Sequence, residues 1–127
     1  MRTPYLIATV AYCGLLWVLS SDPTPPQFEL PFEILGLDKV IHAVLYAVLG
    51  GIVSVGIRTS GRNPSAWTQC FAPILFAAVY GAVDEIHQSF VPNRDFDLGD
   101  ILADLAGAAI IQMVLLHVWW RRPIDGR

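Results

Sequence analysis

The stretch VIHAVLYAVLGGIVSVGI, residues 40–57, decides the fold of this chain. It contains no Lys, Arg, Asp or Glu, and its only ionisable side chains are those of His42 and Tyr46. An apolar run of about 18 residues or more is long enough to cross the roughly 30 Å hydrocarbon core of a bilayer as a helix. The stretch therefore predicts a transmembrane helix.

Three further runs are long and mainly apolar, at about residues 4–20, 67–90 and 100–120. The whole chain is 54% hydrophobic and 15% charged, whereas soluble domains have about 25% charged residues. A soluble four-helix bundle needs polar outer faces, and these runs are apolar all round. We therefore expect an all-α fold, a four-helix transmembrane bundle that forms a single domain over residues 1–127. The first run also resembles a cleavable signal peptide, although its apolar length favours an uncleaved helix.

Basic residues stay preferentially on the cytoplasmic side of a membrane. With the N-terminus inside, six basic residues are cytoplasmic and two are outside. The six are Arg2, Arg58, Arg62, Arg121, Arg122 and Arg127, and the two are Lys39 and Arg94. The distribution predicts a multi-pass protein of the cytoplasmic (inner) membrane with both termini cytoplasmic.

Small residues recur every four positions on three of the expected helices, and such stripes allow helix backbones to approach closely in lipid. They are Ala43, Ala47 and Gly51, then Ala77 and Gly81, then Gly99, Ala103 and Gly107. We expect the second, third and fourth helices to pack tightly together. The first helix has no comparable stripe, so we expect it at the periphery.

Polar and ionisable residues gather where these three helices reach the outside in the predicted orientation. The predicted binding residues are Asp38, Lys39, His42, Tyr46, Asp84, Glu85, Gln88, Arg94, Asp100 and Asp104. Each charged residue inside a membrane costs about 2.5–3.5 kcal/mol on insertion scales, so such residues usually pair or serve a function. We therefore expect this cluster to converge into a site that faces the outside, or periplasm.

The chemistry of the cluster leaves several roles open. His42, Asp84 and Glu85 are candidates for a general acid or base. Asp84, Glu85, Asp100 and Asp104 offer the hard oxygen ligands that a divalent cation prefers. A purely structural alternative is a salt-bridged cap, in which Asp97 or Asp100 caps the fourth helix and Lys39 and Arg94 pair with Asp84 and Glu85.

Three segments together resemble the VanZ-like family of small membrane proteins, named for a teicoplanin-resistance protein. They are DKVIHAVLYAVLG at 38–50, YGAVDEIHQSFVPNR at 80–94 and DLGDILADLAG at 97–107. The family usually has Asn where this chain has Asp104, and the substitution adds a charge. The resemblance implies a membrane protein of the cell envelope that is linked to teicoplanin and antibiotic resistance, but it does not supply a reaction.

Three functions compete for the cluster. The first is binding or modification of a cell-envelope amphiphile, a membrane lipid or a lipid-linked envelope precursor, with lower sensitivity to teicoplanin-type glycopeptides. The second is a membrane-interface enzyme, for which the sequence shows no Ser or Cys nucleophile beside a base. The third is a small transporter or proton relay, which ranks last because the inner halves of the helices carry almost no polar residues. No nucleic acid is expected as a partner, and an oligomer stays open.

Overall fold

The computed structural model describes residues 1–23 and 36–121, and these residues form helices without any strand. The helices are α1 (Thr3–Ser20), α2 (Leu37–Arg58), α3 (Ala66–Gln88) and α4 (Leu98–Arg121). All of them are long and apolar enough to cross a membrane. The predicted all-α architecture with four membrane spans is confirmed, whereas Arg122 and Arg127 lie outside the described residues.

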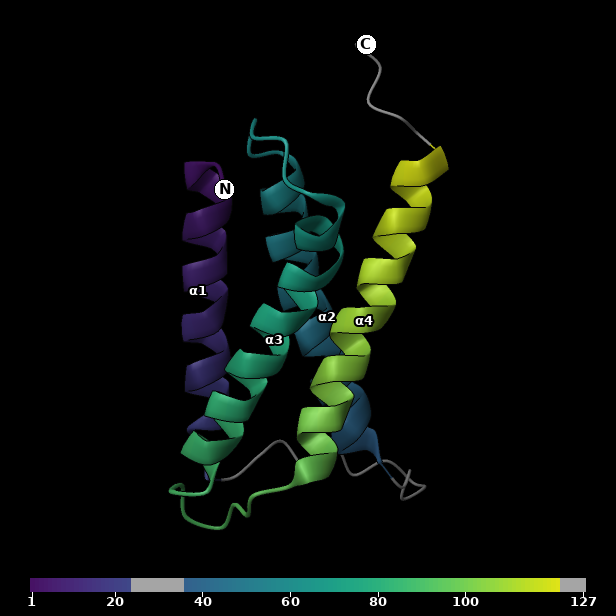
Figure 1. Ribbon diagram of the computed structural model, residues 1–127. Coiled ribbons are helices and arrows are strands. Elements are labelled where there is room, and N and C mark those ends of the chain that lie inside the picture. The colour runs from purple at the N-terminus through teal and green to yellow at the C-terminus, as the bar shows by residue number, and fades with distance from the viewer. Residues whose placement is uncertain (24–35, 122–127) are drawn as a thin grey trace.

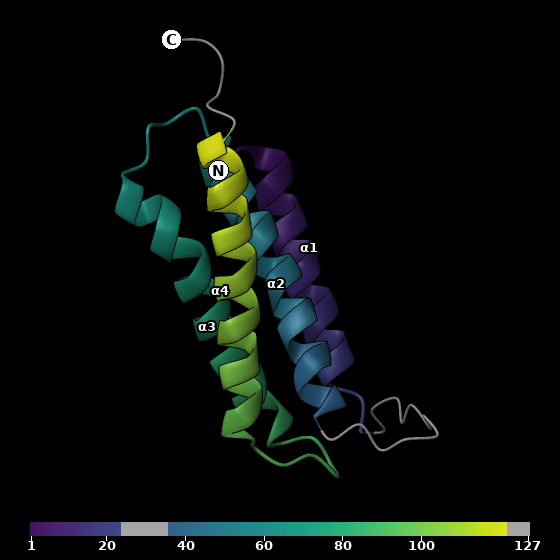
Figure 2. The same ribbon diagram turned by 90° about the vertical axis from the view of Figure 1, so that its right-hand side faces the viewer.

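The helices form an up-and-down bundle, so α1 and α3 run in one direction and α2 and α4 in the other (Figures 1 and 2). The N-terminus and the end of α4 lie at the same end of the bundle (Figure 1). The opposite end is where α1 and α3 end and α2 and α4 begin, and we call it the acidic end. This arrangement gathers the polar cluster at one end, while the direction of that end across the membrane stays a prediction.

Local chemistry explains where α3 begins and ends. The hydroxyl of Ser65 accepts a hydrogen bond from the backbone N–H of Thr68 at 3.1 Å, which caps the first turn. The helix ends at Gln88, not at the predicted residue 90. The chain turns there, and Val91 N–H bonds back to the Gln88 carbonyl at 2.9 Å.

The closest helix pair is α2 with α4. Gly107 lies directly against the backbone carbonyl of Ala43, so a Cβ at residue 107 would collide with main-chain atoms. Gly50 faces Ala108, whose Cβ would lie only 3.3 Å from a Cβ at residue 50. Helix α1 contacts α2 and α3 but not α4 among the described residues. The small-residue stripes therefore mark a real interface, and α1 is peripheral as expected.

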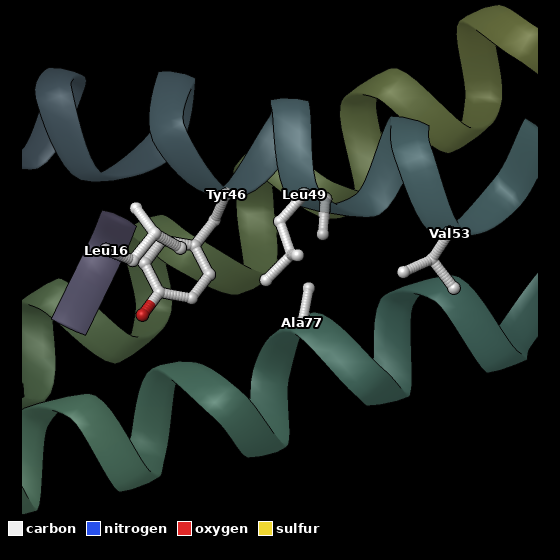
Figure 3. Close-up of a cluster of buried hydrophobic side chains, with 6 residues drawn as sticks. Leu16, Tyr46, Leu49, Val53 and Ala77 are labelled. Carbon is white, nitrogen blue, oxygen red and sulfur yellow. The ribbon is translucent and has the colours of Figure 1, made fainter. Parts of the chain in front are cut away.

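The buried apolar core is small and lies along the bundle axis (Figure 3). Its members are Leu16, Tyr46, Leu49, Val53, Ala77 and Ala108. Many large apolar side chains point outward instead, for example Val44 and Leu75 at 57% and 65% exposed. That distribution suits a bilayer, since lipid tails solvate outward apolar side chains and close backbone packing holds the helices together.

A proline in α3 explains a polar contact deep in the bundle. Pro73 has no backbone N–H, so the carbonyl of Gln69 four residues earlier loses its helical donor. Gln112 of α4 donates from its side-chain Nε2 to that carbonyl oxygen at 2.7 Å. The proline thereby creates an acceptor that ties α3 to α4.

Candidate functional site

Lys39 is the centre of a cluster of ion pairs with Asp38, Asp97 and Asp100. We call the part of the acidic end that holds this cluster the mouth. The Lys39 ammonium contacts the carboxylates of Asp38 at 2.9 Å, Asp100 at 2.7 Å, and Asp97. Asp38 and Lys39 belong to the first turn of α2, whereas Asp97 immediately precedes α4 and Asp100 lies in its first turn. One cation therefore holds the starts of two parallel helices together and partly neutralises three carboxylates.

A His–Asp pair with a buried carboxylate lies one turn deeper. His42 Nδ1 is 3.0 Å from Asp104 Oδ1, and His42 Nε2 is 3.8 Å from Asp100 Oδ2. The Asp104 side chain is only 1% exposed. It packs directly against Gly81 of α3, where a Cβ would collide with its carboxylate. Three helices thus fix the position of this carboxylate.

Asp84 of α3 lies beside this pair and is 4% exposed. Its Oδ2 accepts hydrogen bonds from the hydroxyl of Tyr46 at 3.3 Å and from Nε2 of Gln88 at 3.2 Å. Its Oδ1 is buried without a hydrogen-bond partner among the described residues. The predicted acid is therefore present at the site with one acceptor unused.

Glu85 fastens the connection between α3 and α4. Its Oε1 accepts a hydrogen bond from the backbone N–H of Asp97 at 2.7 Å. Asp97 Oδ1 in turn accepts the N–H of Gly99 at 2.6 Å, which caps the start of α4. The hydrogen bond from Lys39 lowers the pKa of the Asp97 carboxyl below its usual range. Glu85 and Asp97 therefore set the place where α4 begins.

Part of the salt-bridged cap expected from the sequence is present, with different partners. Lys39 pairs with the three carboxylates at the mouth and not with Asp84 or Glu85 among the described ion pairs. Arg94 donates from Nε to the backbone carbonyl of Asp22 at 3.3 Å. The deeper carboxylates, Asp84 and Glu85, are consequently not accounted for by that cap.

A cavity of about 320 Å³ opens beside these groups, between α1, α2 and α3. Its apolar walls come from α1, which supplies Leu16 and Leu19, and from α2, which supplies Leu37, Ile41 and Leu45. Its polar lining is Ser20, Asp22, Asp38, His42, Tyr46, Asp84, Gln88 and Arg94. Six of the ten predicted binding residues line this cavity; Lys39, Glu85, Asp100 and Asp104 do not.

The predicted cation ligands are arranged differently from the expectation. Among the described residues, the carboxylates whose oxygens lie within 4.8 Å of one another are Asp38, Asp97 and Asp100. Only Asp100 belongs to both this group and the predicted set. The ammonium of Lys39 already contacts all three carboxylates, so the protein supplies its own cation at this point.

Two features of the site were missed by sequence reasoning. Ser20 of α1 is buried in the cavity wall, with its hydroxyl 3.4 Å from Nδ1 of His87 in α3. The His87 ring stacks on Trp17 at 3.8 Å between centroids. No local motif signals this pair, because its members are 67 residues apart. The Ser20 hydroxyl also donates to the Trp17 carbonyl of its own helix at 3.0 Å.

The second missed feature is polarity in the other half of the bundle. Gln112 is 1% exposed and Ser54 is 2% exposed. Gln112 follows Asp104 by eight residues, so a four-residue spacing through Ala108 places all three on one side of α4. That spacing was visible in the sequence and could have identified Gln112 as a buried residue.

Comparison with known protein families matches residues 6–120 of the chain to VanZ/LLP1. No curated protein and no solved structure matches the chain. The matched range includes all four membrane-spanning helices almost completely, together with the whole polar cluster. The chain is therefore a membrane protein that belongs to the VanZ/LLP1 family.

Proposed function

We propose that this protein binds a cell-envelope amphiphile, a membrane lipid or a lipid-linked cell-wall precursor, in the cavity at its acidic end. The observation that carries the proposal is the division of the cavity lining. Leu16, Leu45 and their apolar neighbours form walls for a hydrocarbon chain, while His42, Tyr46 and Asp84 supply a polar region for a head group. An amphiphile is the class of ligand that matches both surfaces at once.

The size of the cavity supports partial enclosure of such a ligand. Ligand pockets commonly measure about 300–1,000 Å³, and this cavity has a volume of about 320 Å³. It accommodates a head group and the first part of a chain, and the remainder of the chain would extend into the bilayer. The position of the cavity between transmembrane helices gives lipid-soluble molecules a short route to it.

The surroundings of the site extend the proposal to the cell envelope. The excess of basic residues at the opposite end of the bundle supports an orientation in which the acidic end lies on the outer side of the cytoplasmic membrane. Envelope precursors and lipophilic glycopeptides meet the membrane on that side. Binding of an envelope amphiphile there would lower sensitivity to teicoplanin-type glycopeptides.

The test compares the wild-type protein with a variant whose cavity is filled. Leu45→Trp adds a large side chain to the cavity wall, and Val44→Trp adds the same side chain to a neighbouring exposed position. Each protein is purified in detergent, and the co-purifying amphiphiles are quantified by mass spectrometry. We expect the wild type and Val44→Trp to retain the same species and Leu45→Trp to lose most of it. Equal retention by all three would reject the cavity as the binding site.

The resistance part of the proposal has its own readout. Expression of the wild type in a susceptible bacterium should raise the inhibitory concentration of teicoplanin, and Leu45→Trp should not. An unchanged inhibitory concentration with the wild type would reject the role in resistance. The co-purification experiment would then still decide whether the cavity binds an amphiphile.

A second candidate is a membrane-interface enzyme, and the geometry of His42 favours it. Asp104 orients one ring nitrogen, as carboxylates do for catalytic histidines, and His42 lines the cavity. A divalent cation on Asp84, Glu85, Asp100 or Asp104 would assist such chemistry. Lipid analysis of a deletion strain complemented with wild type, His42→Ala or Asp84→Asn tests this. Turnover predicts one lipid that accumulates in all strains except that with wild type, and unchanged profiles would reject it.

A further inference from the structure

The side-chain donors nearest to Asp84 are already engaged. Tyr46 and Gln88 both donate to Asp84 Oδ2, at 3.3 and 3.2 Å. His42 Nδ1 is bonded to Asp104 outside the cavity lining. Arg94 also lines the cavity and uses its Nε for the backbone carbonyl of Asp22. The surroundings of Asp84 are therefore better matched to a head group that donates hydrogen bonds.

Asp84 provides the acceptor for such a donor. It is a cavity-lining residue that is 4% exposed, and its Oδ1 has no hydrogen-bond partner among the described residues. Leaving a buried charged acceptor unsatisfied is more costly than leaving a neutral one. No Lys, Arg or His of the described chain forms an ion pair with this carboxylate. Asp84 thus lacks both a donor on one oxygen and a counter-charge.

The charges around the cavity favour a cationic head group. The lining contains the carboxylates of Asp22, Asp38 and Asp84 and the guanidinium of Arg94. Lys39 contacts Asp38 from outside the lining and shares its single charge with Asp97 and Asp100, and Arg94 donates from Nε to the backbone carbonyl of Asp22. Asp84 has no ion pair among the described residues, and the lining holds more carboxylates than cationic side chains. A phosphate or sulfate there would meet this negative charge at close range.

We propose that the amphiphile bound in this cavity carries a primary ammonium group, which pairs with Asp84. An ammonium has three N–H donors and a positive charge, so it supplies both of the things that Asp84 lacks. A sugar hydroxyl would satisfy the oxygen but not the charge. The hydrocarbon part of the ligand lies against Leu16, Leu45 and the other apolar walls. This inference rests on the proposed function, because it names the head group of the same ligand.

The test uses three amphiphiles that share one chain and differ in the head group: decylammonium, decyl glucoside and decyl phosphate. Binding to the protein in zwitterionic nanodiscs is measured by equilibrium dialysis, with empty nanodiscs subtracted. We expect decylammonium to bind at least about tenfold more tightly than decyl phosphate, with the glucoside in between. Asp84→Asn, which keeps the shape and removes the charge, should lose about tenfold in affinity for decylammonium.

Asp95→Asn is the matched control, since it removes the same charge from an exposed residue that does not line the cavity. It should leave decylammonium binding unchanged. Equal losses in Asp84→Asn and Asp95→Asn, or a preference for the phosphate, would overturn the pairing with Asp84. Equal binding of decylammonium and the glucoside would overturn the ammonium preference but retain the amphiphile site. Failure of all three amphiphiles to bind above empty nanodiscs would count against the proposed function itself.

Discussion

At the scale of single residues, the site depends on carboxylates that are held by different neighbours. Asp104 is the position at which this chain departs from the Asn usual in the VanZ-like pattern. It lies 3.0 Å from His42 and directly against Gly81. Asp97 has the opposite environment, because it is exposed and pairs with Lys39 at the mouth. Two substitutions separate what charge contributes in these two settings.

Asp104→Asn keeps an oxygen that can accept from His42 and removes the charge, whereas Asp104→Ala removes both. We expect the free energy of unfolding to fall by about 1 kcal/mol for Asn and about 3 kcal/mol for Ala. Unfolding by SDS in mixed micelles, followed by circular dichroism, measures both. If Asp104→Asn were as stable as the wild type, the charge of Asp104 would make no contribution to the pair.

Asp97→Asn tests the ion pair with Lys39 while the side chain keeps an oxygen for the N–H of Gly99. Because the folded-state pKa of Asp97 is lowered, its stabilising effect is present above the unfolded-state pKa of about 3.9. The effect disappears as the pH falls through the lower folded-state value. We therefore expect Asp97→Asn to melt at a lower temperature than the wild type from pH 8 to about pH 5. The difference should shrink as the pH falls below the unfolded-state value and through the lower folded-state pKa, and a difference that grew on acidification would contradict the assignment.

At the scale of elements, the helices contact one another at two backbone carbonyl groups. Gly107 leaves room for the carbonyl of Ala43, which lets α2 and α4 approach closely. Pro73 leaves the carbonyl of Gln69 without a helical donor, and Gln112 supplies one. In lipid no water replaces a missing donor, so each such group needs a partner from another helix.

A double-mutant cycle tests the link between Pro73 and Gln112. Gln112→Leu should lower the free energy of unfolding by about 1–2 kcal/mol, because the Gln69 carbonyl loses its donor. Pro73→Ala restores a backbone N–H at residue 73, so Gln112→Leu should cost less in that background. We expect a coupling energy of about 1 kcal/mol from SDS unfolding of the four proteins. Additive effects would show that the Gln112 contact does not compensate for the proline.

At the scale of the whole molecule, the two ends of the bundle differ in chemistry. The acidic end carries Lys39, Asp84, Asp100 and the cavity, whereas Arg58 lies at the other end over the ring of Trp119 at 4.4 Å. The N-terminus and the end of α4 share that second end (Figure 1). The bias of basic residues predicts that this second end is cytoplasmic.

Cysteine labelling tests this orientation on intact cells. Cys13 and Cys70 are first replaced by Ala, and single cysteines are then introduced at exposed positions, as Asn63→Cys or Asp95→Cys. A membrane-impermeant maleimide should label the Asp95→Cys variant and spare the Asn63→Cys variant. Both should react after permeabilisation, which controls for accessibility. The reverse pattern in intact cells would place the acidic end in the cytoplasm.

The sequence by itself determined the four membrane spans, because the hydrocarbon core accepts only long apolar helices and the charges outside them are sparse. It also placed Asp84, His42 and Asp104 near one end, since each lies about a turn or two from a helix end. Only the tertiary structure decided the pairings: Lys39 with the mouth carboxylates, His42 with Asp104, and Tyr46 with Asp84. The physical reason is that periodicity places a side chain on its own helix, whereas the rotation and depth of each helix against its neighbours depend on close contacts such as Gly107 with Ala43. The cavity beside α1 likewise follows from that packing and has no signature in any single segment.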